Sequence, residues 1–428
     1  MTTSVFTALL VCCGVYFTAA SRGFALRRLP RALRSVFGGK GEGEGISVYS
    51  ALCTDLAATL GTGNIVGVAA AVLTGGPGAL VWMVLFSFFS MSTKCAENIL
   101  AVQYRGRDCD GNPLGGPFSY IRLGLGGRWE WMARLFAFAC AAGGALGLGT
   151  VIQSNSIGLA LANVVGGPST KNLFLISVGI TVPAALVIIG GGRRIARLAE
   201  KLIPVMAVCY LAACVLILLR FAGRIPMVVG DALHAAFSFR AAGGAALGHC
   251  ISVGVRRSVF SNEAGLGTAP IAAGASRGQD PLEQGDAGIV SVFVDTTFLC
   301  TLTGLCILVT GAAEGQGTAV DASAAVWELG LPLSPGTARM LLSIFLSLFA
   351  FTTIVGWNFF AERSWLFLFP DGRGLGLYRV LYLAAVFFGP FLAPEAAWHA
   401  ADLCNACMAL PNITALFLLR REALAHMH

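Results

Sequence analysis

The sequence predicts an all-α, polytopic membrane protein with about eleven transmembrane helices, and three observations support this fold class. Hydrophobic residues make up 56% of the 428 residues, charged residues only 12%, and the mean hydropathy is +0.76. The apolar residues fall in repeated blocks of about 20 or more, the length that an α-helix needs to cross a bilayer. Most of the 29 Lys and Arg residues lie between alternate blocks, as basic residues do in cytoplasmic loops. Little of the chain is left for a large soluble domain.

The blocks form one leading helix and ten core helices, which we number in chain order. The leading helix is expected at 4–20. The core helices are expected at 47–73, 78–102, 129–163, 170–190, 196–221, 232–255, 286–312, 337–365, 376–393 and 398–419. This divides the chain into a leading helix with a basic, Gly-rich cytoplasmic linker at 1–45, a helical core at 46–420 and a short cytoplasmic tail at 421–428.

The basic residues predict which side of the membrane each loop faces. If the leading helix begins outside the cell, the inner segments hold all of the Lys and Arg residues except Lys171, Arg220, Arg224, Arg240 and Arg339. We therefore expect an outer N-terminus, a cytoplasmic C-terminus and a location in the cell membrane. Arginines follow the leading helix and no basic residue precedes it, so we expect a retained helix rather than a cleaved signal. Basic residues dispersed over many short loops argue against nucleic-acid binding.

The most informative segment is DLAATLGTGNIVG, residues 55–67 of core helix 1. It places the run Gly-Thr-Gly-Asn, residues 61–64, in the middle of an otherwise apolar span. A helix is interrupted at this depth only where its freed N–H and C=O groups face protein, water or a bound solute. A half-helix that starts near Gly63 would point N–H groups at a carboxylate, and one that ends near Leu60 would leave carbonyls for a cation. The segment therefore predicts a binding site within the membrane.

Core helix 6 carries a second candidate interruption, at Gly243-Gly244 with Gly248 nearby. Its position five helices after the first predicts an inverted repeat of five plus five helices with a site at the midplane. The two repeats would cover about 46–221 and 232–420. His249 in the same helix is either a neutral packed residue or a group that titrates near physiological pH in the cavity.

Four acidic residues lie at or near membrane depth, where ionisable groups are costly and usually functional. They are Asp55, Glu97, Asp295 and Glu362. Asp55 is close enough to the break to influence a cation or a proton. Glu97 is expected to pair with Lys94, one turn away, near the inner surface. Glu362 is expected near the inner end of its span, together with Arg363.

Nine segments resemble the signature segments of the sodium:alanine/glycine symporter family, in order and with compatible spacing over about 45–419. They are GTGNIVGVAAAVLTGGPGALVWM (61–83), KCAENILAVQYR (94–105), GGPFSYI (115–121), VIQSNSI (151–157), GGRRIARLAEKLIPVMAV (191–208), FSNEAGLGTAPIA (260–272), FVDT (293–296), TTIVGWNFFAE (352–362) and ALPNITAL (409–416). The stretch 261–267 is highly specific. The chain departs from the family pattern at 118–120, at Thr268 and at 273–275. Because both regions are expected in inner loops, the departures concern gating more than the ligand.

The resemblance implies a leucine-transporter-type fold that imports a small neutral amino acid with sodium by alternating access. Alanine or glycine would be the substrate, with D-alanine and serine as further candidates, and no enzyme activity is expected. The implied substrate residues lie on core helices 1, 3 and 8, and they are Thr62, Gly63, Asn64, Gln153, Thr353 and Trp357. N–H groups around Thr62 and Gly63 would hold the carboxylate, the polar side chains would line one wall, and Trp357 would cap the side-chain pocket.

The resemblance also implies a sodium site between core helices 1 and 8. Its ligands would be the carbonyls of Ala57 and Leu60 and the hydroxyls of Thr352 and Thr353, which are hard oxygen atoms of the kind an alkali cation prefers. From the residues alone, the two threonines could instead bond back to the preceding helical turn. Gln153 could likewise be satisfied by a neighbouring helix rather than by a ligand.

Two other functions are compatible with the residues. A proton-coupled or facilitative amino acid permease on the same fold is the main alternative. A membrane-embedded enzyme is the weaker one, because the chain has only five histidines and no convincing nucleophile with a nearby base. The preference among alanine, glycine and serine, the stereoselectivity, the number of sodium ions and the oligomeric state stay open at this point.

Overall fold

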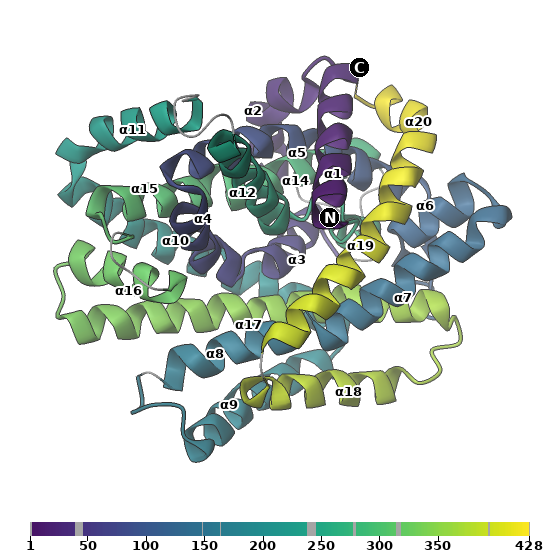
Figure 1. Cartoon of the computed structure of the whole chain (residues 1–428). Helices are drawn as coiled ribbons and strands as arrows, with labels where there is room; N and C mark the ends of the chain where they lie inside the picture. Colours follow the sequence, from purple (N-terminus) through teal and green to yellow (C-terminus); the bar gives the residue numbers. More distant parts are fainter. Residues whose placement is uncertain are drawn as a thin grey trace.

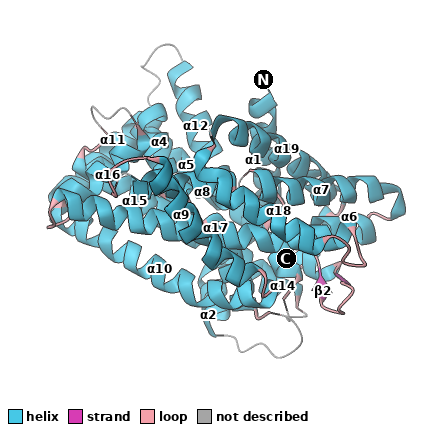
Figure 2. Cartoon of the chain, turned by 90° about the horizontal axis from the view of Figure 1, so that it is seen from below, coloured by secondary structure: helices cyan, strands magenta, loops and turns pink. Residues whose placement is uncertain are grey.

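The computed structural model describes residues 2–38, 46–147, 149–162, 164–237, 245–276, 280–313, 318–392 and 394–427, and this part of the chain is almost entirely helical (Figure 1). Its one sheet is a short antiparallel pair, in which β1 (Gly106–Arg107) lies beside β2 (Pro113–Leu114) and Gly106 is opposite Leu114. Figure 2 shows this sheet at the edge of a continuous helical bundle.

The helices of the first half begin with α1 and end with α10. They are α1 (Thr2–Ala20), α2 (Phe24–Gly38), α3 (Val48–Thr59), η1 (Thr62–Asn64), α4 (Val66–Gly75), α5 (Pro77–Gln103), α6 (Pro117–Gly124), η2 (Gly127–Trp129), α7 (Glu130–Leu146), α8 (Val151–Ala162), α9 (Thr170–Ile188) and α10 (Gly192–Arg220). Several begin with a local cap, as where the Ser47 hydroxyl accepts a hydrogen bond from the Ser50 N–H before α3.

The helices of the second half run from η3 to α20. They are η3 (Ala222–Arg224), α11 (Ile225–Phe237), α12 (Ala245–Asn262), α13 (Ala269–Gly274), α14 (Pro281–Val292), η4 (Phe293–Cys300), α15 (Thr301–Thr310), α16 (Ala319–Gly330), α17 (Pro335–Leu368), α18 (Leu375–Phe388), η5 (Gly389–Phe391), α19 (Pro394–Leu418) and α20 (Arg420–Ala425). The segment η4 is a π-helix, which joins α14 and α15 into one continuous rod.

The predicted spans fall on these helices. Seven helical stretches among the described residues are long and apolar enough to cross a membrane, and an eighth is obtained if α1 and α2 are counted as one bent span. The remaining predicted spans fall on shorter pieces: α3 with α4, α11 with α12, and α18. Hydropathy therefore locates the apolar blocks correctly, but it does not show where they are broken.

One predicted span is broken at a place that the sequence analysis did not predict, and a further interruption follows the predicted end of core helix 6 at 255. The expected helix 129–163 divides into α7 and α8 around Gly147–Thr150. In core helix 6, Gly243-Gly244 lies outside the described residues, and Gly248 lies inside the unbroken α12. The interruption that the structure describes is further along, at 263–268 between α12 and α13, where Gly265 and Gly267 have φ of +88° and +84°. These left-handed conformations are open to glycine and stop the helix.

The basic linker after the leading helix contains a second helix. The axes of α1 and α2 differ by 83°. The turn between them, at Ser21–Gly23, contains Arg22 and Gly23 with φ of +53° and +71°. Residues 39–45, the Gly-rich part of the linker, lie outside the described residues.

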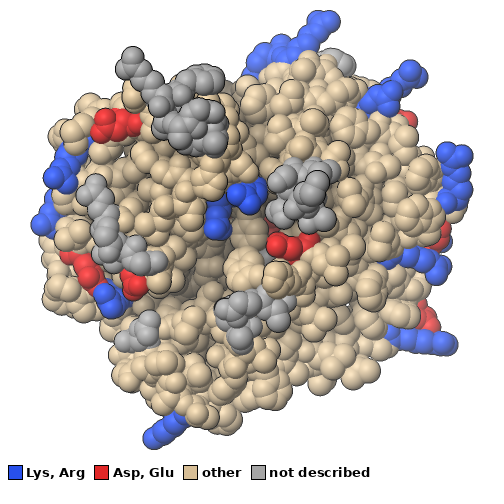
Figure 3. Space-filling view, in the orientation of Figure 1, with Lys and Arg blue, Asp and Glu red and all other residues tan. Residues whose placement is uncertain are grey.

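The broken helices lie in the middle of the bundle. In Figure 1, α3, α4 and α12 occupy the centre of the view, the long α17 passes beside them, and α9 and α18 lie at the periphery. The outer helix α9 exposes Phe174, Val178, Val182 and Leu186, one helical turn apart, as expected for a face in contact with lipid. Figure 3 shows a surface that is largely uncharged on this side, with a few basic side chains in a hollow near its centre.

Candidate functional site

The break in core helix 1 is built around the side chain of Asn64. After α3 ends at Thr59, Gly61 is extended, with φ −123° and ψ −162°, and a single 3-10 turn follows at 62–64. The Gly61 N–H donates to Asn64 Oδ1 at 3.0 Å, and the Asn64 N–H donates back to the Gly61 carbonyl at 3.3 Å. In an uninterrupted helix these two N–H groups would bond to the carbonyls of Ala57 and Leu60. Both carbonyls are thereby released from their helical partners.

The amides on the other side of the break are also free of other backbone partners. The N–H groups of Thr62 and Gly63 donate to no other part of the backbone among the described residues, because α4 begins only at Val66. Thr62 and Gly63 are half-buried, and N–H groups without a backbone acceptor near the start of α4 favour an anionic group at this point. The break thus presents carbonyls at one end and amides at the other.

Three of the expected substrate residues surround Gly61. A Cβ at Gly61 would lie 2.9 Å from Thr353 Oγ1 on α17 and 3.8 Å from Gln153 Oε1 on α8. The Thr62 hydroxyl lies 3.5 Å from the same Gln153 oxygen. Gln153 stands in the first turn of α8, so the unpredicted break before α8 positions it. The structure therefore brings Thr62, Gln153 and Thr353 together around Gly61, where a side chain would crowd the Thr353 hydroxyl.

Trp357 lies one turn beyond Thr353 on α17 and is almost completely buried. It packs against the junction of α7 and α8, where a Cβ at Gly149 would come within 2.5 Å of the Trp357 Cβ. The Tyr382 hydroxyl links this junction to α17 because it lies within hydrogen-bond distance of two carbonyls, Ile354 at 2.7 Å and Gly149 at 3.0 Å, and can donate its one hydrogen to either. The tryptophan is fixed between three helices.

Phe260 is a neighbour of the break that the sequence analysis did not single out. Its ring atoms lie 3.7 Å from the position of a Cβ on Gly63, and its ring centroid lies 5.6 Å from that of Trp398 on α19. The signal was available, since Phe260 directly precedes the specific stretch 261–267 at the end of α12.

The two helices that carry the expected sodium ligands, α3 and α17, cross near the end of α3. A Cβ at Gly356 would lie 2.6 Å from the backbone nitrogen of Ala58, so the two helices are in close contact. The hydroxyls of Thr352 and Thr353 both donate to the carbonyl of Phe349, at 2.9 and 3.0 Å. A hydroxyl that donates its hydrogen keeps its lone pairs, so this back-bonding is compatible with coordination of a cation.

Asn64 turns its amide nitrogen away from the substrate residues and into a buried cluster. The nitrogen donates to Asp295 Oδ1 at 2.6 Å and to Ser261 Oγ at 3.1 Å. The Asp295 carboxylate also accepts hydrogen bonds from Ser261 Oγ and Thr296 Oγ1, at 2.7 and 2.6 Å. Asp295 is fully buried on the π-helix η4, a type of helix that is frequent at functional sites. All three donors are neutral.

A buried ion pair lies beside the same C-terminal end of α12, and it corrects one expectation. Lys94 pairs with Asp55, with 2.8 Å between Nζ and Oδ2, and it also donates to the carbonyl of Asn262. It does not pair with Glu97, although the two are one turn apart, because Glu97 points toward Gly265 and Asn412. Asp55 is thus already balanced by a lysine.

Two further titratable residues have contacts that spacing along the chain does not predict, and for one of them, His249, the packed-interior alternative is wrong. Glu362 accepts two hydrogen bonds from Arg379 on α18, at 2.7 and 2.8 Å, while its neighbour Arg363 pairs with Asp108. His249 is an exposed residue whose Nε2 lies 3.0 Å from the Thr74 carbonyl, so it is not packed in the interior. Tertiary contacts, rather than spacing along the chain, select the partners.

A membrane bundle in which broken helices meet at a buried polar site is the architecture of a secondary transporter. The fold agrees, since the structure resembles that of MhsT, solved in complex with L-phenylalanine, with a TM-score of 0.63 over 90% of this chain and 93% of that one at 16% identity.

The chain belongs to the sodium:alanine symporter family, whose model matches residues 1–428. It is 37% identical over 421 residues to the sodium/alanine symporter AgcS of Methanococcus maripaludis, covering 96% of this chain and 90% of that one. It is also 40% identical over 416 residues to an uncharacterised transporter of Haemophilus influenzae, covering 95% and 89%. The chain is therefore a multi-pass membrane transporter that belongs to a family of sodium-coupled amino acid symporters, and it is not an enzyme, as the sequence predicted.

Proposed function

We propose that this symporter imports a small neutral amino acid, alanine or glycine, with sodium across the cell membrane by alternating access. The observation that carries the proposal is the break at Gly61–Asn64, which offers free amides beside Thr62, Gln153 and Thr353. The substrate carboxylate would accept from the amides of Thr62 and Gly63. Gln153 and Thr353 would contact its polar groups.

A small substrate side chain suits the apolar walls of this site. Phe260 stands over Gly63 from one side, and Trp357 follows Thr353 by one turn on the other. Both rings are large and packed against other helices, which limits the space for a long side chain. Serine and D-alanine are further candidates of similar volume. Asn64 would act by shaping the break rather than by touching the substrate.

Sodium would bind between α3 and α17. The released carbonyls of Ala57 and Leu60 would face the hydroxyls of Thr352 and Thr353 across the helix crossing. Coupling then follows from the shared segment, because a cation that orders the carbonyls before Gly61 also fixes the amides after it. One helix bundle would rock against the rest, and sodium would favour the outward-open state.

Uptake of labelled L-alanine into proteoliposomes tests this function. We expect uptake when sodium is present outside and almost none when choline replaces it. Unlabelled glycine, L-serine and D-alanine should compete, and large amino acids should not. Sodium-dependent uptake that no small neutral amino acid inhibits would contradict the proposed substrate.

A second candidate is proton coupling at the same site, and Asp295 is the observation that favours it. Its buried carboxylate touches Asn64 and accepts hydrogen bonds from neutral groups. A carboxyl group in such a place could carry a proton through the transport cycle. Uptake that persists in choline and follows an imposed pH gradient would favour this candidate over sodium.

A further inference from the structure

We infer that α2 and the arginines beside it form a binding site for the phosphate headgroup of an anionic phospholipid in the cytoplasmic leaflet. The inference adopts the orientation proposed above, with the N-terminus outside, but it does not depend on the substrate. The site is separate from the break in core helix 1.

The helix α2 is fixed to the transporter core along one side. Ala25, Ala32 and Val36 are buried at spacings of seven and four residues, and the helix packs on α14 and α5. Arg28 forms two hydrogen bonds with the buried carboxylate of Asp286 on α14, at 2.9 and 3.0 Å. With α1 and α2 83° apart, α2 lies across the end of a membrane span, as an interfacial helix does.

The other side of α2 carries positive charge without a matching carboxylate. Arg27, Arg31 and Arg34 are exposed and follow the spacing i, i+4 and i+7, which places them on one face. No ion pair among the described residues includes any of the three. Arg27 has one hydrogen bond, at 3.5 Å to the Ser21 carbonyl. Three unpaired guanidinium groups on one face attract an anion.

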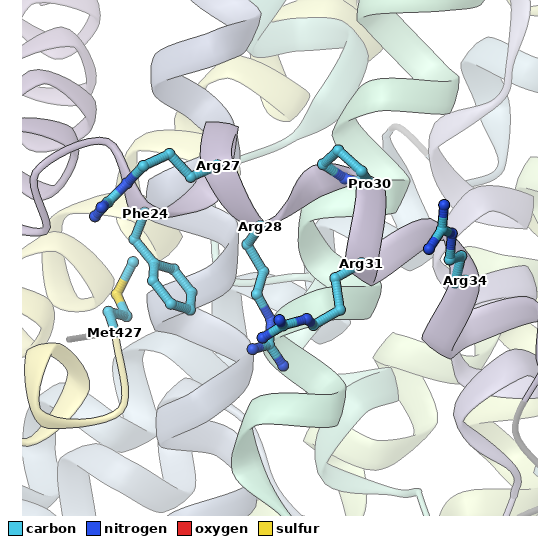
Figure 4. Close-up of a pocket in the computed structure, with 7 residues that line it drawn as sticks. All are labelled: Phe24, Arg27, Arg28, Pro30, Arg31, Arg34 and Met427. Carbon is cyan, nitrogen blue, oxygen red and sulfur yellow. The ribbon is translucent and has the colours of Figure 1, made fainter.

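A pocket of about 470 Å³ lies among these side chains. In Figure 4 the guanidinium groups of Arg28 and Arg31 lie together, with Arg27, Phe24 and Met427 on one side and Arg34 on the other, so the lining is both basic and apolar. Guanidinium groups bind phosphate oxygens through paired N–H donors. The apolar residues would contact the glycerol and the first part of an acyl chain.

The surroundings favour a lipid over a soluble anion. Leu26 and Phe37 on α2 are 42% and 61% exposed, which suits a helix that lies at the boundary of headgroups and acyl chains. The cytoplasmic leaflet is also rich in anionic lipid, which attracts basic segments. Because Arg28 ties α2 to α14, and α14 continues into η4 with Asp295, a bound lipid would steady a helix that reaches the transport site.

Binding can be measured with the full-length protein in detergent, without amino acid or sodium, so that the result is independent of transport. The ligand is phosphatidylglycerol, and phosphatidylcholine and glycerol phosphate are the controls. We expect phosphatidylglycerol to raise the melting temperature of the wild type. Each arginine contributes roughly fivefold in affinity, so R27Q/R31Q/R34Q should bind about a hundredfold more weakly.

A matched variant separates the site from net charge. R128Q/R373Q/R421Q removes three exposed arginines that are expected on the same side but lie outside the pocket, and it should respond to phosphatidylglycerol like the wild type. An equal response of the two triple variants would overturn the inference. An equal response of the wild type to glycerol phosphate would show a soluble-anion site instead and would also overturn it.

Discussion

The two breaks in the central helices differ in which groups satisfy the backbone N–H and C=O groups that each break frees. At the break after α3, the side chain of Asn64 takes up the Gly61 N–H, and the carbonyls of Ala57 and Leu60 are left without helical partners. At the break after α12, protein side chains occupy the freed groups. The Gly265 N–H donates to Glu97 and its carbonyl accepts from Asn412, while the Asn262 carbonyl accepts from Lys94.

Because of this difference, we assign the break after α3 to ligand binding and the break after α12 to the stability of the fold. Freed backbone groups in a buried segment must find partners in protein, water or solute. After α12 the protein supplies them with buried charged and amide side chains. After α3 the carbonyls of Ala57 and Leu60 and the amides of Thr62 and Gly63 are left without backbone partners among the described residues, and we propose that an ion and a carboxylate bind to them. Substitutions at the first break should therefore impair transport, and substitutions at the second should impair folding.

The largest effect is expected for Gly61→Ala at the first break. The added Cβ would lie 2.9 Å from Thr353 Oγ1, so either the Thr353 hydroxyl or the backbone of the break would have to shift. Uptake should fall on the order of a hundredfold, since a displacement of about 1 Å at a reacting site has effects of this size. Gly179→Ala, which meets no atom within 4 Å, is the control and should transport normally. Normal uptake by Gly61→Ala would contradict the assignment of the first break to ligand binding.

A large loss of folding stability, rather than a specific loss of transport, is expected for Lys94→Met at the second break. It leaves the buried Asp55 carboxylate unpaired and removes the donor to the Asn262 carbonyl. Loss of one partner of a buried ion pair costs about 3–5 kcal/mol. The yield of folded protein and its melting temperature in detergent should fall sharply.

The double variant Asp55→Leu/Lys94→Met sharpens this test, because it removes both charges together. It should recover part of the lost stability. Lys171→Met, at an exposed lysine, should have no effect. If Lys94→Met folded as well as the wild type and only lost affinity for sodium, the second break would belong to the binding site.

A smaller effect is expected for Asn412→Leu. Asn412 donates to Glu97 and to the Gly265 carbonyl, so its loss leaves two buried acceptors short of a donor. The cost is about 2 kcal/mol of stability, and the sodium concentration for half-maximal uptake should not change. Thr414→Val, on the exposed side of α19, is the control. A shifted sodium dependence in Asn412→Leu would contradict the division between the two breaks.

The apolar spans and the first break were predictable from the sequence, because hydropathy and a Gly-Thr-Gly-Asn run act locally. The break before α8 was not, since Gly147–Thr150 continue a glycine-rich apolar stretch whose junction is held by Tyr382 from α18. The same limit applies to Lys94. Spacing suggests Glu97 as its partner, and only the packing of α3 on its neighbours brings Asp55 there.

The site residues show the same division. The family resemblance implies Thr62, Gln153 and Thr353 as substrate residues, and in the structure all three lie close to Gly61. The direction of the Asn64 side chain depends on Asp295, more than 200 positions later in the chain, on a π-helix that no local pattern announces.

The most direct test of the central claim is the sodium dependence of alanine uptake in Thr353→Ala. Its hydroxyl is proposed to complete a site with the carbonyls released at the first break. Ser347→Ala removes a hydroxyl that bonds back to the same helix further from the break, and it serves as the matched control. We predict that half-maximal uptake by Thr353→Ala needs about tenfold more sodium, while Ser347→Ala is unchanged and both proteins fold normally. Unchanged uptake and sodium affinity in Thr353→Ala would contradict the account.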